Sequence, residues 1–249
     1  MKIMDRIETV DYLKSKVCSE RLAVSRYGDG EYLLMNKIIG QKTEDKERMS
    51  PLLLKSIKVK GQLVCIPFLK PHNIERKDMW YKAQKFLVET SQHELYGNAM
   101  WNVYDFLTDN NVLPFLFSKN TILVTGYPDE SKASFKDLRP DLKIIATPLT
   151  NASEKYKQIK LKILDYNNQN KVDNIIFACG AISEVLISDL ISICEANLVD
   201  LGSVMNAILN EYAINKKPLV QLHRMSWTNN VNIKKQSDMF FKKLEKIGG

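Results

Sequence analysis

LAVSRYGDGE, residues 22–31, joins a short apolar run to a turn that holds two acidic side chains. The apolar run predicts a β-strand, and the apolar residues of Tyr32–Met35 predict the start of a helix. Asp29 and Glu31 therefore stand one residue apart in a strand-to-helix turn, each preceded by a glycine. Carboxylates in such a turn present oxygens to a hard divalent cation, which prefers carboxylate and phosphate ligands. The pattern predicts a metal–diphosphate site.

The same turn also has a purely structural interpretation. Gly-Asp-Gly is common turn chemistry, because glycine tolerates positive φ and aspartate bonds its own backbone. Glu31 would favour the first turn of a helix through the helix dipole. The local sequence leaves both interpretations open.

The whole chain has the composition of an ordinary globular protein, with 249 residues, 45% hydrophobic and 26% charged. We expect a single domain over 1–249. No stretch approaches the roughly 20 apolar residues that a membrane span needs. The first eight residues, MKIMDRIE, contain no apolar core of a signal peptide. The expected location is the cytoplasm, with the inner face of the membrane as an option.

Cysteine and histidine usage excludes some classes of site. The four cysteines form no Cys-x-x-Cys pair, and none of the three histidines has ligand spacing with a cysteine. Buried free thiols are therefore expected, and a zinc site is disfavoured.

Positive charge is concentrated at the carboxyl end of the chain. Residues 214–249 hold eight basic and two acidic side chains, which leaves the rest of the chain near +1 out of a total of +7. A near-neutral body argues against nucleic acid as a partner. The tail combines Met239, Phe240, Leu244 and Ile247 with lysines, which is typical of a basic amphipathic helix. Such a helix touches anionic lipid or a partner enzyme, or it docks on the core.

Apolar strands alternate with helical segments along the chain. This order predicts an α/β fold of modified Rossmann-like type, with a mostly parallel sheet and helices on both faces. The aromatic-rich region at about 76–112 is expected to be a helical insertion, broken at Tyr96-Gly97-Asn98. The strands are predicted at 22–26, 62–66, 121–125, 142–146, 174–178 and 198–201.

Several predicted strands end in glycine, at the sheet edge where open α/β sheets bind ligands. A glycine between a strand and a helix N-terminus can hold a phosphate, or it can simply make the turn tight. The loops in question contain Gly126, Tyr127, Gly180, Ala181 and Gly202. The sequence has neither a Gly-x-Gly-x-x-Gly fingerprint nor a Gly-x-x-x-x-Gly-Lys loop, which disfavours nicotinamide cofactors and P-loop ATP hydrolysis.

The hexapeptide RYGDGE, residues 26–31, resembles the Arg-aromatic-Gly-Asp-Gly-Glu signature of the GT-D-type bacterial glycosyltransferases, a family first catalogued as a domain of unknown function. The turns at Cys179–Ala181 and Val199–Gly202 are similar to that family in order and spacing. The likeness spans most of the chain, roughly from Leu13 to Leu209.

The resemblance implies a transferase that moves a hexose, typically from UDP-glucose, to a saccharide or glycoprotein glycan. It implies Mn²⁺ or Mg²⁺ held by Asp29 and Glu31 at the diphosphate, with Arg26 and Gly28 near the nucleotide. The predicted loop residues Gly126, Tyr127, Gly180, Ala181 and Gly202 would then bind the nucleotide sugar.

An inverting transfer also needs a general base for the acceptor hydroxyl. Glu184 and Asp200 are candidates by their location at the predicted ligand-binding edge. Each also has a structural interpretation, Glu184 as a helix surface residue and Asp200 as a helix cap.

Two other functions stay open at this point. A metal-dependent phosphohydrolase acting on a nucleotide or phosphosugar would use the same acidic turn. A non-catalytic nucleotide-sugar-binding module in a polysaccharide or adhesin assembly would use the charged tail for contacts.

Overall fold

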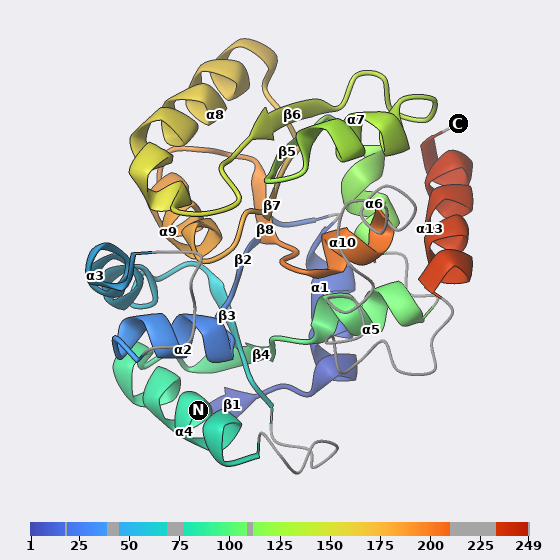
Figure 1. Cartoon of the computed structure of the whole chain (residues 1–249). Coiled ribbons are helices and arrows are strands. Elements are labelled where there is room, and N and C mark those ends of the chain that lie inside the picture. Colours follow the sequence, from blue (N-terminus) through green and yellow to red (C-terminus); the bar gives the residue numbers. More distant parts are fainter. Residues whose placement is uncertain (18, 39–44, 69–76, 109–111, 210–232, 249) are drawn as a thin grey trace.

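The computed structural model describes residues 1–249 apart from 18, 39–44, 69–76, 109–111, 210–232 and 249. Its centre is a parallel sheet of eight strands in the order β1-β4-β3-β2-β8-β7-β5-β6 (Figure 1). The strands are β1 Lys2–Ile3, β2 Ala23–Arg26, β3 Leu63–Ile66, β4 Leu95–Asn98, β5 Thr121–Thr125, β6 Lys143–Ala146, β7 Asn174–Ala178 and β8 Asn197–Asp200.

Helices cover both faces of this sheet (Figure 1). One face carries α2 Asp29–Met35, α3 Lys46–Ser56, α4 Lys77–Ser91, α8 Tyr156–Asn170 and α9 Ile182–Leu190. The other carries α1 Arg6–Val17, α5 Trp101–Leu107, α6 Val112–Ser118, α7 Pro128–Phe135, α10 Val204–Ile208 and α13 Ile233–Gly248. The prediction of a Rossmann-like α/β fold with a parallel sheet is confirmed.

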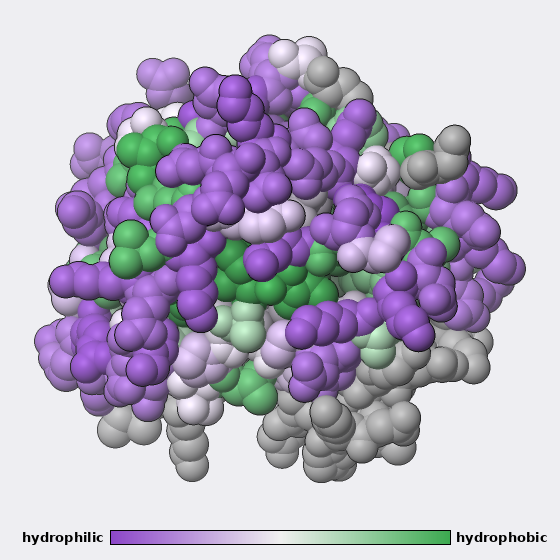
Figure 2. Space-filling view, turned by 90° about the horizontal axis from the view of Figure 1, so that it is seen from above, coloured by the Kyte–Doolittle hydropathy of each residue, from purple (hydrophilic) through white to green (hydrophobic). Residues whose placement is uncertain are grey.

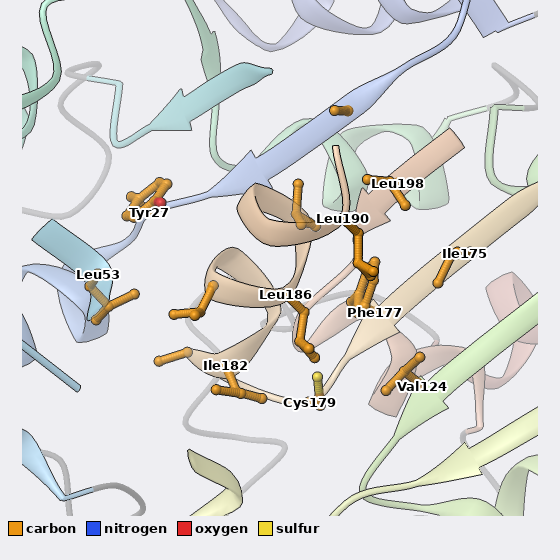
Figure 3. Packing of buried hydrophobic residues seen from close by; sticks show 14 of the residues in the cluster. Tyr27, Leu53, Val124, Ile175, Phe177, Cys179, Ile182, Leu186, Leu190 and Leu198 are labelled. Atoms are coloured by element: carbon orange, nitrogen blue, oxygen red, sulfur yellow. The ribbon is translucent and has the colours of Figure 1, made fainter. Parts of the chain in front are cut away.

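Each face of the sheet has its own hydrophobic core. On the α9 face, Ile182, Leu186 and Leu190 lie along the side of the helix that faces Phe177 and Val124 of the strands (Figure 3). All of them are buried, and α9 carries buried side chains around most of its circumference. The buried residues of α9 include the polar Ser183, Glu184 and Ser188 as well as its apolar side chains, because the helix lies in the interior between the sheet and α3.

The edge strand β6 contributes to the molecular surface. Lys143 and Ala146 are exposed, whereas Ile145 is buried. Seen from the side of β6, the surface is largely hydrophilic with a hydrophobic strip near its centre (Figure 2). A short edge strand with an exposed lysine resists edge-to-edge pairing with other chains.

The six predicted strands are confirmed within about one residue at each end. The prediction of a helical insertion at about 76–112 is wrong. That region contains α4 and α5, but strand β4 lies between them and pairs with β1 and β3 inside the sheet. The two-residue strand β1 was also missed, since a run that short carries no periodicity.

Gly97 explains why β4 looks like a helix break in the sequence. A side chain at this position would meet Cys65 Sγ at 2.5 Å and Thr9 Cγ2 at 3.1 Å. A side chain at residue 97 would force Cys65 and Thr9 to move, which favours glycine at this point of the strand.

Ser50-Pro51 fits an N-cap followed by proline at the first helical position, but α3 begins earlier, at Lys46. Asp45 caps it, because its side chain accepts hydrogen bonds from the backbone N–H groups of Glu47 and Arg48. Pro51 lies inside the helix. Ser50 donates instead to the Met35 carbonyl at 2.7 Å and so joins α3 to α2.

The basic helix of the tail, α13, uses its apolar face inside the fold. Phe240 packs edge-on against Phe117 and Phe135, with ring centroids 5.7 and 6.3 Å apart. Ser237 donates to the Ile208 carbonyl at 2.6 Å. The docking alternative is therefore confirmed for residues 233–248, while residues 214–232 of the predicted tail lie outside the described residues. Among the described helices, none has the length and apolarity to cross a membrane.

Leu244→Ala is expected to lower the free energy of unfolding by roughly 2–4 kcal/mol, because it removes a fully buried side chain that anchors α13. Ile247→Ala on the same helix is the control, since Ile247 is 41% exposed and its loss should cost less than about 1 kcal/mol. Urea unfolding measures both. Equal, small losses in the two variants would show that α13 does not dock as described.

The cysteine prediction is confirmed for three of the four residues. Cys65, Cys179 and Cys194 are free and buried. Cys18 lies outside the described residues.

Candidate functional site

The strands β2 and β8 are neighbours whose following helices cover opposite faces of the sheet. Val24 pairs with Val199, so the two strands run side by side to their carboxyl ends. The chain then turns to α2 on one face and to α10 on the other. Where successive loops diverge in this way, an open α/β sheet forms a ligand-binding crevice. We call this place the β2–β8 crevice.

The acidic turn directly follows β2 and opens α2 at this end of the sheet. Gly28 is the N-cap of α2, and Asp29 and Glu31 occupy the first and third helical positions. The backbone N–H of Gly28 donates to Glu31 Oε2 at 2.7 Å, and the N–H of Gly30 donates to Asp29 Oδ1 at 3.1 Å. Both acidic residues are partly buried. The predicted strand-to-helix turn is thus confirmed, and Glu31 also stabilises its own helix.

Arg26 and Asp200 meet across the crevice at the ends of β2 and β8. Arg26 Nη1 lies 3.3 Å from Asp200 Oδ2, and their side chains are 15% and 4% exposed. Arg26 Nε also donates to the Ala99 carbonyl at 2.8 Å. Burial raises the pKa of Asp200, and the Arg26 guanidinium opposes that shift by favouring the carboxylate.

Glu184 is a buried acid in the first turn of α9, only 2% exposed, so the surface interpretation is wrong. Burial raises its pKa well above the ordinary value, and the nearby charges of Asp200 and Glu31 raise it further. Among the described residues, Glu184 Oε2 has no hydrogen-bond partner. A buried, unpaired carboxyl oxygen is costly, and it is available to a ligand.

Glu31 belongs to the same electrostatic group. Burial raises its pKa, while its bond from the Gly28 N–H and the charge of Arg26 lower it. Glu31, Glu184 and Asp200 therefore share the field of one guanidinium. Residues from three segments of the sequence, 26–31, 183–184 and 200, meet here. Ser183, which donates to Asp200, was not among the predicted site residues.

The remaining predicted residues follow β5 and β7, the next strands of the sheet. Gly180 is exposed with φ of +71°, and a Cβ there would meet open space. Ala181 is the buried N-cap of α9, and Tyr127 is the partly buried N-cap of α7. A Cβ on Gly126 would meet Leu149 Cδ2 at 2.7 Å. The topology places these loops at the carboxyl edge that also holds the crevice.

The acidic turn fits one kind of metal site better than others. Within the described part of the chain, no three His, Cys, Asp or Glu side chains are grouped to hold a metal ion. Asp29 and Glu31 offer two carboxylates on one helical turn. Mg²⁺ is typically held by one or two carboxylates together with substrate phosphates. The pair therefore suits a cation that arrives with a diphosphate.

Glu184→Gln is expected to stabilise the protein increasingly as pH rises. The folded-state pKa of Glu184 is raised, so the native state holds the proton more tightly than the unfolded chain does. Wild-type stability therefore falls as pH rises above the unfolded pKa, about 4.3, towards the folded value. The uncharged amide of the variant does not titrate, so the free energy of unfolding of the variant does not fall in this way.

Urea unfolding of wild type and Glu184→Gln at pH 4 and pH 7.5 measures the difference. Glu154→Gln is the control, because Glu154 is exposed and its ion pair with Arg48 spans 3.7 Å at the surface. A stability difference for Glu184→Gln that is the same at both pH values would contradict the assignment.

Comparison with solved structures identifies the fold. One match is described as the domain of unknown function 1792 with a distinct glycosyltransferase fold, at TM-score 0.62 and 22% identity, covering 82% of this chain and 79% of that one. Another is described as a new glycosyltransferase (DUF1792) from Streptococcus sanguinis, at TM-score 0.61 and 19% identity over 82% of each chain. No protein-family model and no curated protein matches the sequence. The chain therefore has the DUF1792 glycosyltransferase fold.

Proposed function

We propose that this protein is a glycosyltransferase that takes a hexose from a UDP-sugar, typically UDP-glucose, with Mn²⁺ or Mg²⁺ at Asp29 and Glu31. One observation carries the proposal. The Asp-x-Glu turn lies at the β2–β8 crevice of a sheet whose fold is shared with solved glycosyltransferase-fold structures. The acceptor in this proposal is a saccharide or a glycoprotein glycan.

Asp29 and Glu31 would hold the cation at the donor's diphosphate. When bound, such a cation neutralises the departing nucleotide diphosphate as a Lewis acid. Both carboxylates lie in the first turn of α2, which the bond from the Gly28 N–H to Glu31 already stabilises.

The other loops would bind the donor through backbone groups. The exposed Gly180 leaves the N-terminus of α9 open, and backbone N–H groups there suit phosphate oxygens. Gly28, Gly126, Tyr127, Ala181 and Gly202 complete the proposed donor-binding set.

Glu184 and Asp200 remain the candidate bases for the acceptor hydroxyl. The unpartnered Oε2 of Glu184 is the better placed to accept a proton, whereas Asp200 is engaged with Arg26 and the Gly202 N–H. A base must be ionised to act, so a raised pKa for Glu184 predicts activity that increases with pH.

Product analysis with UDP-glucose tests the proposal against its rivals. We expect slow release of UDP and glucose with Mn²⁺, and no release in a chelator. Release of inorganic phosphate from UDP or other nucleotides would support a phosphohydrolase instead. Binding of UDP without turnover, across a panel of sugars and acceptors, would support a non-catalytic module.

A further inference from the structure

Two of the three side-chain nitrogens of Arg26, Nε and Nη1, are engaged by the protein itself. Nε donates to the Ala99 carbonyl at 2.8 Å, and Nη1 lies 3.3 Å from Asp200 Oδ2. Ala99 follows β4, and Asp200 ends β8, so one guanidinium ties the carboxyl ends of β2, β4 and β8 together. Its side chain is only 15% exposed.

Gly202 packs directly against the same guanidinium. Its φ is +50°, and a Cβ on it would overlap Arg26 Nη1. Its N–H donates to Asp200 Oδ1 at 3.0 Å, so the two Asp200 oxygens bind Arg26 and Gly202 separately. Arg26, Asp200 and Gly202 therefore form one unit, which we call the crevice clamp.

The clamp lies directly beside the proposed cation site. Arg26 is three residues before Asp29 and ends the strand that leads into α2. Movement of Arg26 would shift the first turn of α2 relative to the loops after β7 and β8. A change of about 1 Å in such a site is enough to lower its function strongly.

We propose that Arg26 is a positioning residue, which acts through Asp200 and Gly202 to set the distance across the β2–β8 crevice, and that it does not contact the nucleotide sugar. This inference rests on the proposed function. It replaces a role for Arg26 in donor binding with a role in holding Asp29 and Glu31 in register with the opposite loops.

The two roles of Arg26 predict opposite effects of Asp200→Asn on UDP affinity. If Arg26 bound the diphosphate, the substitution would release the guanidinium and remove a nearby negative charge, so UDP would bind more tightly. If Arg26 positions the crevice, the substitution loosens the clamp, and UDP binds about 10-fold or more weakly, as for other supporting residues around a metal site.

Calorimetric titration of UDP in Mn²⁺ measures this effect on Asp200→Asn, Gly202→Ala and Arg26→Lys. We expect weaker binding in all three. The control is Asp189→Asn, which removes a partly buried ion pair with Lys160 (2.9 Å) at the other end of α9 and should leave UDP affinity unchanged. Tighter binding by Asp200→Asn, or unchanged binding by the three clamp variants, overturns the inference.

A double-mutant cycle, measured by urea unfolding, separates failure of the clamp from failure of the proposed function. Arg26→Ala removes the atom that a Cβ on Gly202 would overlap, so Gly202→Ala should shift the urea midpoint less in that background than in wild type. Additive shifts would show that no clamp exists. If the cycle shows coupling but wild type does not bind UDP, the proposed function fails and the positioning role fails with it.

Discussion

Arg26→Met is expected to destabilise the protein by about 3–5 kcal/mol at neutral pH, the cost of removing one partner from a buried ion pair. Asp200 would then lie 4% exposed without its cation, next to the buried Glu184. The same cation also favours the ionised form of Glu31. Arg26→Met should therefore lower the free energy of unfolding more than removal of any single surface charge does.

The cost of Arg26→Met should increase with pH. Without the guanidinium, burial raises the pKa of Asp200 further, so the native state takes up protons that the unfolded chain does not. Stability then falls as pH rises through the range between the unfolded and folded pKa values. The penalty is expected to be smaller at pH 5 than at pH 8.

Urea unfolding at both pH values checks this prediction, with Arg48→Met as the matched control. Arg48 forms an exposed ion pair with Glu154 at 3.7 Å, which is worth at most about 1 kcal/mol. If the two arginine substitutions cost the same, the buried charge group is not organised around Arg26.

The second large effect is expected at the acidic turn. Asp29→Asn and Glu31→Gln should each lower kcat with UDP-glucose at least about 100-fold, because Lewis-acid stabilisation is worth several kcal/mol and each 1.36 kcal/mol is tenfold. The amide side chains keep an oxygen that can accept from the Gly30 and Gly28 N–H groups. The loss would therefore come from the missing charge while the fold is preserved.

The chain contains its own control for this pair. Asp45 and Glu47 have the same spacing at the start of α3, where Asp45 caps the helix and Glu47 bonds Lys37 at the surface. Glu47→Gln should leave turnover unchanged. Equal turnover by Glu31→Gln and Glu47→Gln would remove the acidic turn from the mechanism. Far-UV circular dichroism of each variant confirms the fold.

The sequence was informative where one local pattern dominates. β5 and β7 are continuous apolar runs bounded by turn residues, so their length and burial follow from composition alone. The turn at Gly28–Glu31 was predicted for a similar reason, since a strand, a glycine and a helix start lie within ten residues.

Features that depend on contacts between distant parts of the chain could not be predicted from local patterns. β4 contains Gly97 and Asn98, which signal a break, and only the neighbouring Cys65 and Thr9 show why a strand fits there. Tertiary contact overrides local propensity at this position.

The charged group at the crevice shows the same limit. Arg26 and Asp200 are 174 residues apart, and nothing in the sequence near either residue indicates their ion pair. Glu184 has the local pattern of an ordinary acidic residue in a first helical turn, and only the packing of α9 reveals that it is buried.

Calorimetric titration of UDP into the wild-type protein, first with Mn²⁺ and then with a chelator, decides whether Asp29 and Glu31 hold a cation at the diphosphate. We expect UDP to bind at least about 10-fold more tightly with Mn²⁺, and Asp29→Asn to abolish this gain. Equal UDP affinity with and without the metal, or a full metal effect in Asp29→Asn, would contradict this expectation.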